Sequence, residues 1–226
     1  MRIRRLAVLC TAALLATAAP AGLFKNSVDL ADLSEVSPEA LQTLVDTEFA
    51  VFTAQVRLNG VKAAERRAAG GAKAASQTLD AENLDLKAAK AELKAAKANQ
   101  DDERTTAATA MIAGAEEDQE TAKALRRWKN QEQEARQAEV AMAKSAVDLA
   151  EAERDLARVR LLNKEQLPSA KKYELSDFES NVVKRRKELD VAGDKAKDKL
   201  AKLDKLKSEW DQLAKNLDLG EVEEER

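Results

Sequence analysis

Apolar residues recur at every seventh position through most of this sequence, as in the series Leu79, Leu86 and Leu93. This spacing places the side chains in one narrow stripe of a long helix, which is buried in a seam against another helix. Aromatic residues make up only 3% of the chain, so large side chains are too few to fill a thick globular core. The sequence therefore predicts an all-α fold: an elongated antiparallel coiled coil, with one long central helix and a helix folded back at each end.

We expect the central helix over residues 72–163. Counting in sevens from Leu93 leads through Gln100, Ala107 and Gly114 before the series returns to larger residues such as Trp128 and Leu156. A phase kept over so many heptads favours one continuous helix. The polar residues and the glycine in its seam predict a weak point near 98–121, and a true break of the helix there is the main structural alternative.

The first helix is predicted over residues 38–69, after an extended lead-in at 22–37. Ser37 is suited to cap the helix, and Pro38 fits its first turn. The pair Gly70-Gly71 ends the helical pattern, and glycine tolerates the backbone angles of a helix stop. We therefore expect the chain to reverse at this pair. The apolar stripe expected to form the seam of this helix consists of Leu41, Val45, Phe49, Phe52 and Val56, with Leu44 beside it.

The third helix is predicted over residues 173–217, after a turn at 164–172 that contains Pro168. An acidic tail, 218–226, follows it. Trp128 and Trp210 lie 40 and 42 residues from Pro168, so a reversal there would place the two rings side by side by packing. The seam series of this helix is Leu175, Val182, Leu189, Ala196, Leu203, Trp210 and Leu217, with Phe178, Ala192, Leu206 and Leu213 as companions.

The first residues have the pattern of a signal peptide, which we assign to 1–21. Arg2, Arg4 and Arg5 precede an apolar run over 6–19, and small residues follow. The run is shorter than the ~20 residues that span a bilayer, so an uncleaved anchor is the lesser alternative. We expect an exported protein, periplasmic or associated with the cell envelope, and membrane contact is not indicated after cleavage.

Composition limits the chemistry that the chain can perform. It has no histidine, and its single cysteine, Cys10, lies within the predicted leader, so the commonest general base, thiol nucleophile and soft metal ligands are missing from the mature chain. We assign no catalytic, cofactor-binding or metal-binding residue, and we do not expect an enzyme. The formal net charge is -3, and cleavage would remove three arginines and no acid, which argues against a nucleic-acid partner.

The turn near Pro168 carries a recognisable spacing. Arg158, Leu162 and Ser169 follow the pattern Arg-x3-Leu-x6-Ser, and Tyr173 lies just beyond. This resembles the tip of the α-helical hairpin in periplasmic adaptor proteins, the membrane-fusion proteins of tripartite efflux and type 1 secretion systems. The resemblance covers about residues 117–217 and includes no lipoyl or β-barrel domain. It implies docking of these four residues onto the periplasmic end of an outer-membrane channel.

Residue chemistry leaves a second interpretation of the turn open. Arg158 can be a solvated helix residue, Leu162 can close the seam, and Ser169 can cap the third helix. Likewise, Leu167 and Tyr173 either form part of an exposed apolar tip or fold inward and close the hairpin end. The function expected from these features is a non-catalytic scaffold, spacer or docking hairpin. Its partner would be an envelope protein, such as an outer-membrane channel, another coiled coil or a second copy. The alternative is a periplasmic holdase chaperone with helical arms.

Overall fold

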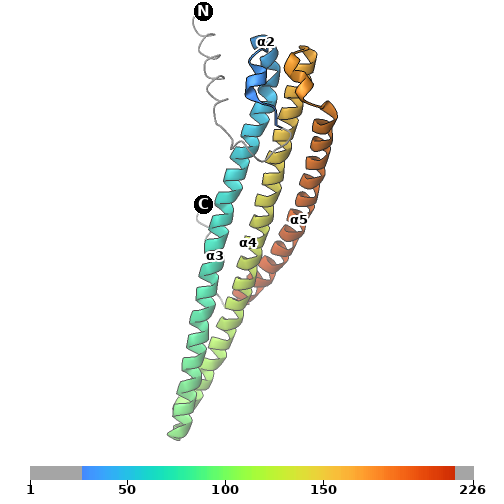
Figure 1. Cartoon of the computed structure of the whole chain (residues 1–226). Helices are drawn as coiled ribbons and strands as arrows, with labels where there is room; N and C mark the ends of the chain where they lie inside the picture. Colours follow the sequence, from blue (N-terminus) through green and yellow to red (C-terminus); the bar gives the residue numbers. More distant parts are fainter. Residues whose placement is uncertain (1–26, 217–226) are drawn as a thin grey trace, which may run out of the picture.

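The computed structural model describes residues 27–216, and in this range the chain is helical with short turns. Three long helices dominate: α3 (Val45–Ala98), α4 (Asp102–Lys164) and α5 (Leu175–Asn216). Figure 1 shows α4 lying between α3 and α5, each of which runs antiparallel to it. The predicted all-α architecture, a central helix with a helix folded back at each end, is confirmed. The predicted leader, 1–21, and acidic tail, 218–226, lie outside the described residues.

The seam of α3 keeps one heptad register along the whole helix. Every seventh residue from Leu44 to Leu93, and every seventh residue from Thr47 to Ala96, is buried or half-buried. The predicted series Leu79, Leu86 and Leu93 belongs to this register. The seam therefore packs against α4 without a phase change over 54 residues of helix.

The predicted reversal at Gly70-Gly71 is wrong, because both glycines lie inside α3. Neither has a positive φ, so neither adopts the backbone conformation of a helix stop. Alanines flank the pair, and alanine is the strongest helix former. The seam also stays in phase on both sides of the pair, so continuing the helix buries Ala68, Ala72 and Ala75.

The chain reverses instead at residues 99–101, inside the stretch 98–121 that the sequence marks as weak. Gln100 has φ 55°, and the Asp101 N–H donates to the Ala96 carbonyl at 3.1 Å, which closes the end of α3. The Asp101 carboxylate then caps α4 by accepting from the Arg104 N–H at 3.0 Å. The alternative of a true break is therefore correct, and a continuous helix over 72–163 is not.

Apart from Leu41, which is half-buried against the core, the apolar stripe predicted as the seam of the first helix faces solvent. Val45, Phe49, Phe52 and Val56 are all exposed. The seam is formed by the series one residue earlier, which begins with the buried Leu44. The prediction followed the largest side chains, whereas counting back in sevens from Leu79 gives Ala72, Glu65, Leu58, Val51 and Leu44.

The second reversal and the packing of α5 follow the prediction closely. A short 3-10 helix, η3 (Pro168–Lys172), joins α4 to α5. The α5 seam residues predicted between Leu175 and Leu213 are buried or half-buried, whereas Leu217 lies outside the described range. The rings of Trp128 and Trp210 stack with their centroids 4.8 Å apart and an interplanar angle of 26°, which confirms their predicted proximity.

The lead-in is compact rather than extended over its described part. It contains a 3-10 helix, η1 (Leu30–Leu33), and is followed by α2 (Pro38–Leu41) and η2 (Gln42–Leu44), which lead into α3. The predicted helix start is confirmed, because the Ser37 hydroxyl accepts from the Ala40 N–H at 3.2 Å. The extended prediction is wrong because burial of apolar side chains folds the segment over α4 and α5. These side chains are Val28, Leu33 and Val36.

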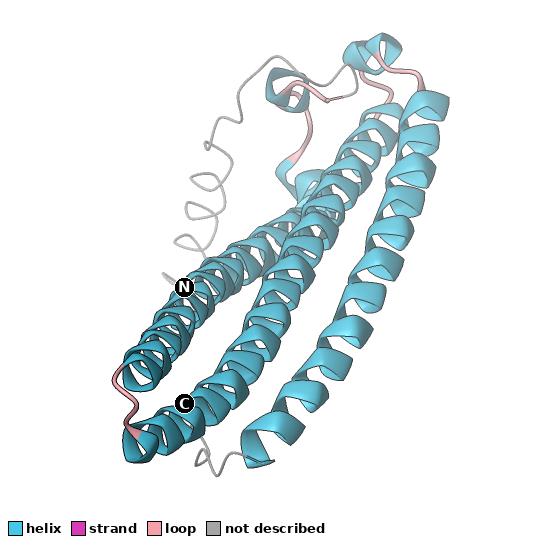
Figure 2. Cartoon of the chain, turned by 90° about the horizontal axis from the view of Figure 1, so that it is seen from below, coloured by secondary structure: helices cyan, strands magenta, loops and turns pink. Residues whose placement is uncertain are grey.

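The molecule is a long rod with unequal ends. Figures 1 and 2 show the three helices side by side at the end that carries the lead-in, and Figure 1 shows the α3–α4 hairpin reaching past the end of α5. At ~1.5 Å per residue, the 63 residues of α4 extend over roughly 95 Å.

Alanine at Gly70 or Gly71 tests the uninterrupted helix. A Cβ at Gly70 would meet nothing within 4 Å, and one at Gly71 would meet only Lys129 Cδ at 3.7 Å. We expect Gly70→Ala and Gly71→Ala each to raise the free energy of unfolding by about 0.5–1 kcal/mol, because glycine loses more backbone entropy in a helix. Urea denaturation measures the change. A loss of stability in both variants would place a turn at the pair.

The stacked tryptophans should contribute strongly to the attachment of α5. We expect Trp210→Ala to lower the free energy of unfolding by about 2–4 kcal/mol, near the lower end of large-to-small changes because both rings are half-buried. Trp210→Phe, which keeps an aromatic ring, should cost less. Tryptophan emission at the fully water-exposed wavelength in single-tryptophan variants would contradict the stacked arrangement.

Candidate functional site

The four residues predicted to form a docking tip lie together at the closed end of the α4–α5 hairpin. Arg158 and Leu162 belong to the last turns of α4, Ser169 lies in η3, and Tyr173 follows η3 directly. The lead-in folds over this end of the hairpin, so the tip is a junction of several elements.

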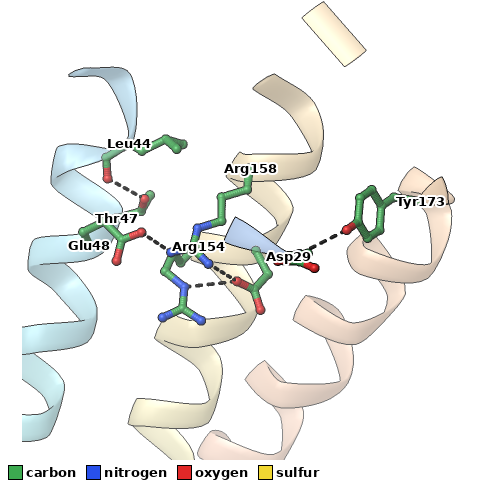
Figure 3. Close-up of polar contacts among 8 residues, drawn as sticks. Asp29, Leu44, Thr47, Glu48, Arg154, Arg158 and Tyr173 are labelled. Carbon is green, nitrogen blue, oxygen red and sulfur yellow. Dashed lines mark hydrogen bonds and ion pairs between the residues drawn. The ribbon is translucent and has the colours of Figure 1, made fainter. Parts of the chain in front are cut away.

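Arg158 is buried in an ionic cluster, with 5% of its surface exposed. Its guanidinium donates to Glu48 of α3 at 2.5 Å (Figure 3). It also donates to Asp155, at 3.3 Å. Arg154 also donates to Asp155, at 3.0 Å. The interpretation of Arg158 as a solvated residue is therefore wrong, and the side chain is equally inaccessible for docking in this conformation.

The ionic cluster has carboxylates that are costly to bury. Burial raises the pKa of Asp155, although Arg154 and Arg158 act in the opposite direction. Within residues 27–216, Arg158 Nε has no hydrogen-bond partner. The cluster thus places opposite charges together in a poorly solvated position, where Arg158 is the common partner of Glu48 and Asp155 and Arg154 pairs with Asp155 alone.

Leu162 is completely buried and belongs to the main hydrophobic core of the molecule. This core gathers side chains from the lead-in, α4, η3 and α5, and its other members are Val28, Leu33, Val36, Leu44, Ala152, Leu156, Val159, Leu161, Ala170, Phe178 and Val182. Leu161, next along the chain, is also buried. Neither leucine is therefore part of an exposed tip, and Leu162 closes the seam as the second interpretation of the turn requires.

Tyr173 fastens the lead-in to the turn. Its hydroxyl donates to the Asp32 carboxylate at 2.6 Å and accepts from the Asp29 N–H at 3.0 Å (Figure 3 shows the second contact). Lys172 Nζ donates to the other Asp32 oxygen at 2.6 Å. The hydrogen bonds from Lys172 and Tyr173 lower the pKa of Asp32. The ring of Tyr173 also meets Phe178 edge to face, with centroids 6.0 Å apart. Tyr173 thus folds inward, as one of the two sequence interpretations required.

Ser169 does not cap α5, which begins only at Leu175. Its hydroxyl is buried and has no hydrogen-bond partner among the described residues. Leu167, which precedes Pro168, is partly buried against the core. Ser169 therefore belongs to the closed turn, and its capping role is not observed.

The chain matches no known family model, and no curated protein or solved structure is significantly similar to it.

Other places that could hold a ligand are few in the described part of the chain. An open groove of about 780 Å³ lies between α4 and α5, and it is lined largely by charged side chains and alanines. Between residues 27 and 216 we find no group of three or more Cys, Asp or Glu side chains placed to hold a metal ion. No helix in that range has an apolar stretch long enough to cross a membrane.

Sequence reasoning missed Glu48 and the lead-in as partners of this site. Glu48 is noticeable in the sequence only as a polar residue beside an apolar stripe. The lead-in offers a better signal, because Val28, Leu33 and Val36 are apolar residues at three- and five-residue spacings ahead of the first cap. Such residues in a segment before a helix indicate packing rather than an extended connection.

Arg158→Ala should destabilise the fold, because it leaves Glu48 and Asp155 without their common partner. We expect a loss of about 2–3 kcal/mol in the free energy of unfolding, less than for a fully buried pair, because Arg154 still pairs with Asp155 and Glu48 is partly exposed. Arg160→Ala is the matched control, two residues further along the same helix. Arg160 forms an exposed ion pair with Glu179 at 2.9 Å, so its removal should cost at most ~1 kcal/mol. Equal stability of the two variants would show that the ionic cluster does not hold the hairpin end.

Proposed function

We propose that this chain is a non-catalytic scaffold or spacer of the periplasm or cell envelope. The observation that carries the proposal is the α3 seam, which continues in one register from Leu44 to Ala96 against α4. A seam of this kind produces length and stiffness rather than an enclosed cavity. The export part of the proposal depends on the leader-like sequence over residues 1–21.

Docking at the hairpin end, if the chain performs it, uses other side chains than those of the adaptor-like motif. Arg158 and Leu162 are committed to internal contacts. The charged side chains that remain exposed around the turn leave this end net basic: Arg160, Lys164, Lys171 and Lys172 against Glu165 and Glu174. A basic end favours a partner with an acidic surface. An outer-membrane channel or a coiled coil with an acidic rim fits that description.

The second candidate function is a periplasmic holdase chaperone. It is favoured by one observation, the exposure of Phe49 and Phe52 on α3. Exposed aromatic side chains on a helical arm can bind unfolded apolar segments. The rod has no enclosed space formed by its arms within the described residues, so we rank this candidate second.

Affinity capture from envelope extracts tests the proposal, with a tag at the C-terminus of the full chain. Export predicts that the protein recovered from the envelope begins at or near Ala19 or Gly22, and N-terminal sequencing checks this. Docking predicts a small set of folded envelope partners. The variant Lys164→Glu with Lys171→Glu should then lose them, because it reverses charge at the exposed end.

The control for capture is Lys94→Glu with Lys97→Glu. This variant makes the same change in net charge, but at the far end of α3. It should retain the docked partners. Capture of many unfolded β-barrel proteins instead would favour the chaperone. A chain that stays in the cytosol with Met1 intact would refute the envelope assignment.

A further inference from the structure

An apolar stripe on α3 is covered by no other part of the described chain. Val45, Phe49, Phe52 and Val56 have exposed fractions of 37%, 66%, 54% and 54%. The rings of Phe49 and Phe52 lie next to each other, with centroids 6.5 Å apart. Large apolar side chains that are exposed contiguously mark interaction surfaces, whereas scattered ones do not.

The stripe has the spacing of a coiled-coil seam. Its residues follow one another at intervals of four, three and four, which keeps them on one face of a helix. At about 100° per residue, this face is turned roughly 150° away from the seam that packs on α4. α3 is therefore built like a helix of a larger bundle, with one seam filled inside the chain and a second seam open.

The order and spacing of residue types in the open stripe are the same from the N-terminal and from the C-terminal end. The pattern Val-x3-Phe-x2-Phe-x3-Val is symmetric about the peptide between Ala50 and Val51. A twofold axis at that point brings a second α3 alongside in the antiparallel direction. Val45 of each copy then faces Val56 of the other, and Phe49 faces Phe52. Interfaces with twofold symmetry require a surface that is complementary to itself, and this stripe has that property.

The charges on either side of the stripe also favour an antiparallel orientation of the second α3. The exposed charges just before it are acidic, Glu39 and Asp46, and those after it are basic, Arg57, Arg66 and Arg67. An antiparallel partner places the acidic end of each copy beside the basic end of the other, with Asp46 close in height to Arg57. A parallel partner would place like charges together, which is unfavourable.

We propose that the stripe of Val45, Phe49, Phe52 and Val56 binds a second copy of this chain in an antiparallel dimer. The contact covers only about three turns of helix on each copy. It therefore buries less surface than the ~1,200–2,000 Å² of a standard stable interface. The dimer is therefore weak, and its population depends on the protein concentration. The proposal does not depend on the location of the protein in the cell.

The dimer has a distinctive shape. The α3–α4 arm leads away from the stripe toward the reversal at 99–101 (Figure 1). A twofold axis near residue 50 points the two arms in opposite directions. At ~1.5 Å per residue, the particle would extend over roughly 150 Å, compared with roughly 95 Å for one chain. The assembly is then a two-ended spacer rather than a single rod.

Sedimentation equilibrium and small-angle scattering of the full chain over a concentration series test the proposal. We expect a monomer–dimer equilibrium and a maximum dimension that grows to about 150 Å at about 100 μM. The variant Phe49→Gln with Phe52→Gln should abolish dimerisation and leave the thermal melt nearly unchanged, since both rings are exposed. Val183→Gln with Val191→Gln is the control, because these exposed valines lie on α5.

A charge exchange tests the direction of the helices. Asp46→Arg and Arg57→Asp alone should each weaken dimerisation roughly three- to tenfold, and the double variant should restore it. A chain that stays monomeric at about 100 μM overturns the proposal, and binding of unfolded polypeptide by the stripe of that monomer would favour the holdase. Dimerisation that survives the phenylalanine substitutions, or a double variant weaker than both single ones, also overturns it.

Discussion

The structure depends on the burial of one heptad seam of α3 against α4. Many of its side chains are alanines, so the seam gains little from any single residue and much from its length. Small side chains also let the two helix axes approach closely, which makes the seam intolerant of a change in phase. The two glycines inside α3 are tolerated because the helix on both sides is already held in register. The placement of the lead-in, the buried arginine cluster and the open stripe all follow from the face of α3 that this seam turns toward α4.

The sequence predicts the long-period features well and the points of reversal less well. The α5 seam and the stack of Trp128 on Trp210 follow from counting along one helix and across one turn. The reversal between α3 and α4 was placed at Gly70-Gly71 because glycine is a strong local signal. The actual reversal at Gln100 uses a positive φ in a residue with no such signature. Only a count carried backwards from Leu79 to Leu44 could have shown that the helix passes through the glycine pair.

The candidate site shows a different limit of sequence reasoning. The spacing of Arg158, Leu162 and Ser169 is a property of one helix and its turn, whereas their exposure depends on segments more than a hundred residues away. Glu48 reaches Arg158 from α3, and Asp32 reaches Tyr173 from the lead-in. A pattern within one hairpin cannot report that a third element covers it. Phe49 and Phe52 are the converse case, because they have the chemistry of core residues and the structure leaves them on the surface.

The lead-in has a consequence for the order in which the molecule can assemble. The α3–α4 and α4–α5 hairpins are formed by helices that are neighbours in the sequence, so each hairpin can form as soon as its second helix has been synthesised. The contact between Asp32 and Tyr173 joins residues 141 positions apart, and it needs the turn after α4 to exist. The lead-in is therefore among the last elements to be ordered, although it precedes the three long helices in the chain. Until synthesis has passed residue 173, its apolar side chains lack the part of their core that α5 supplies, and they remain partly accessible to whatever handles the nascent chain.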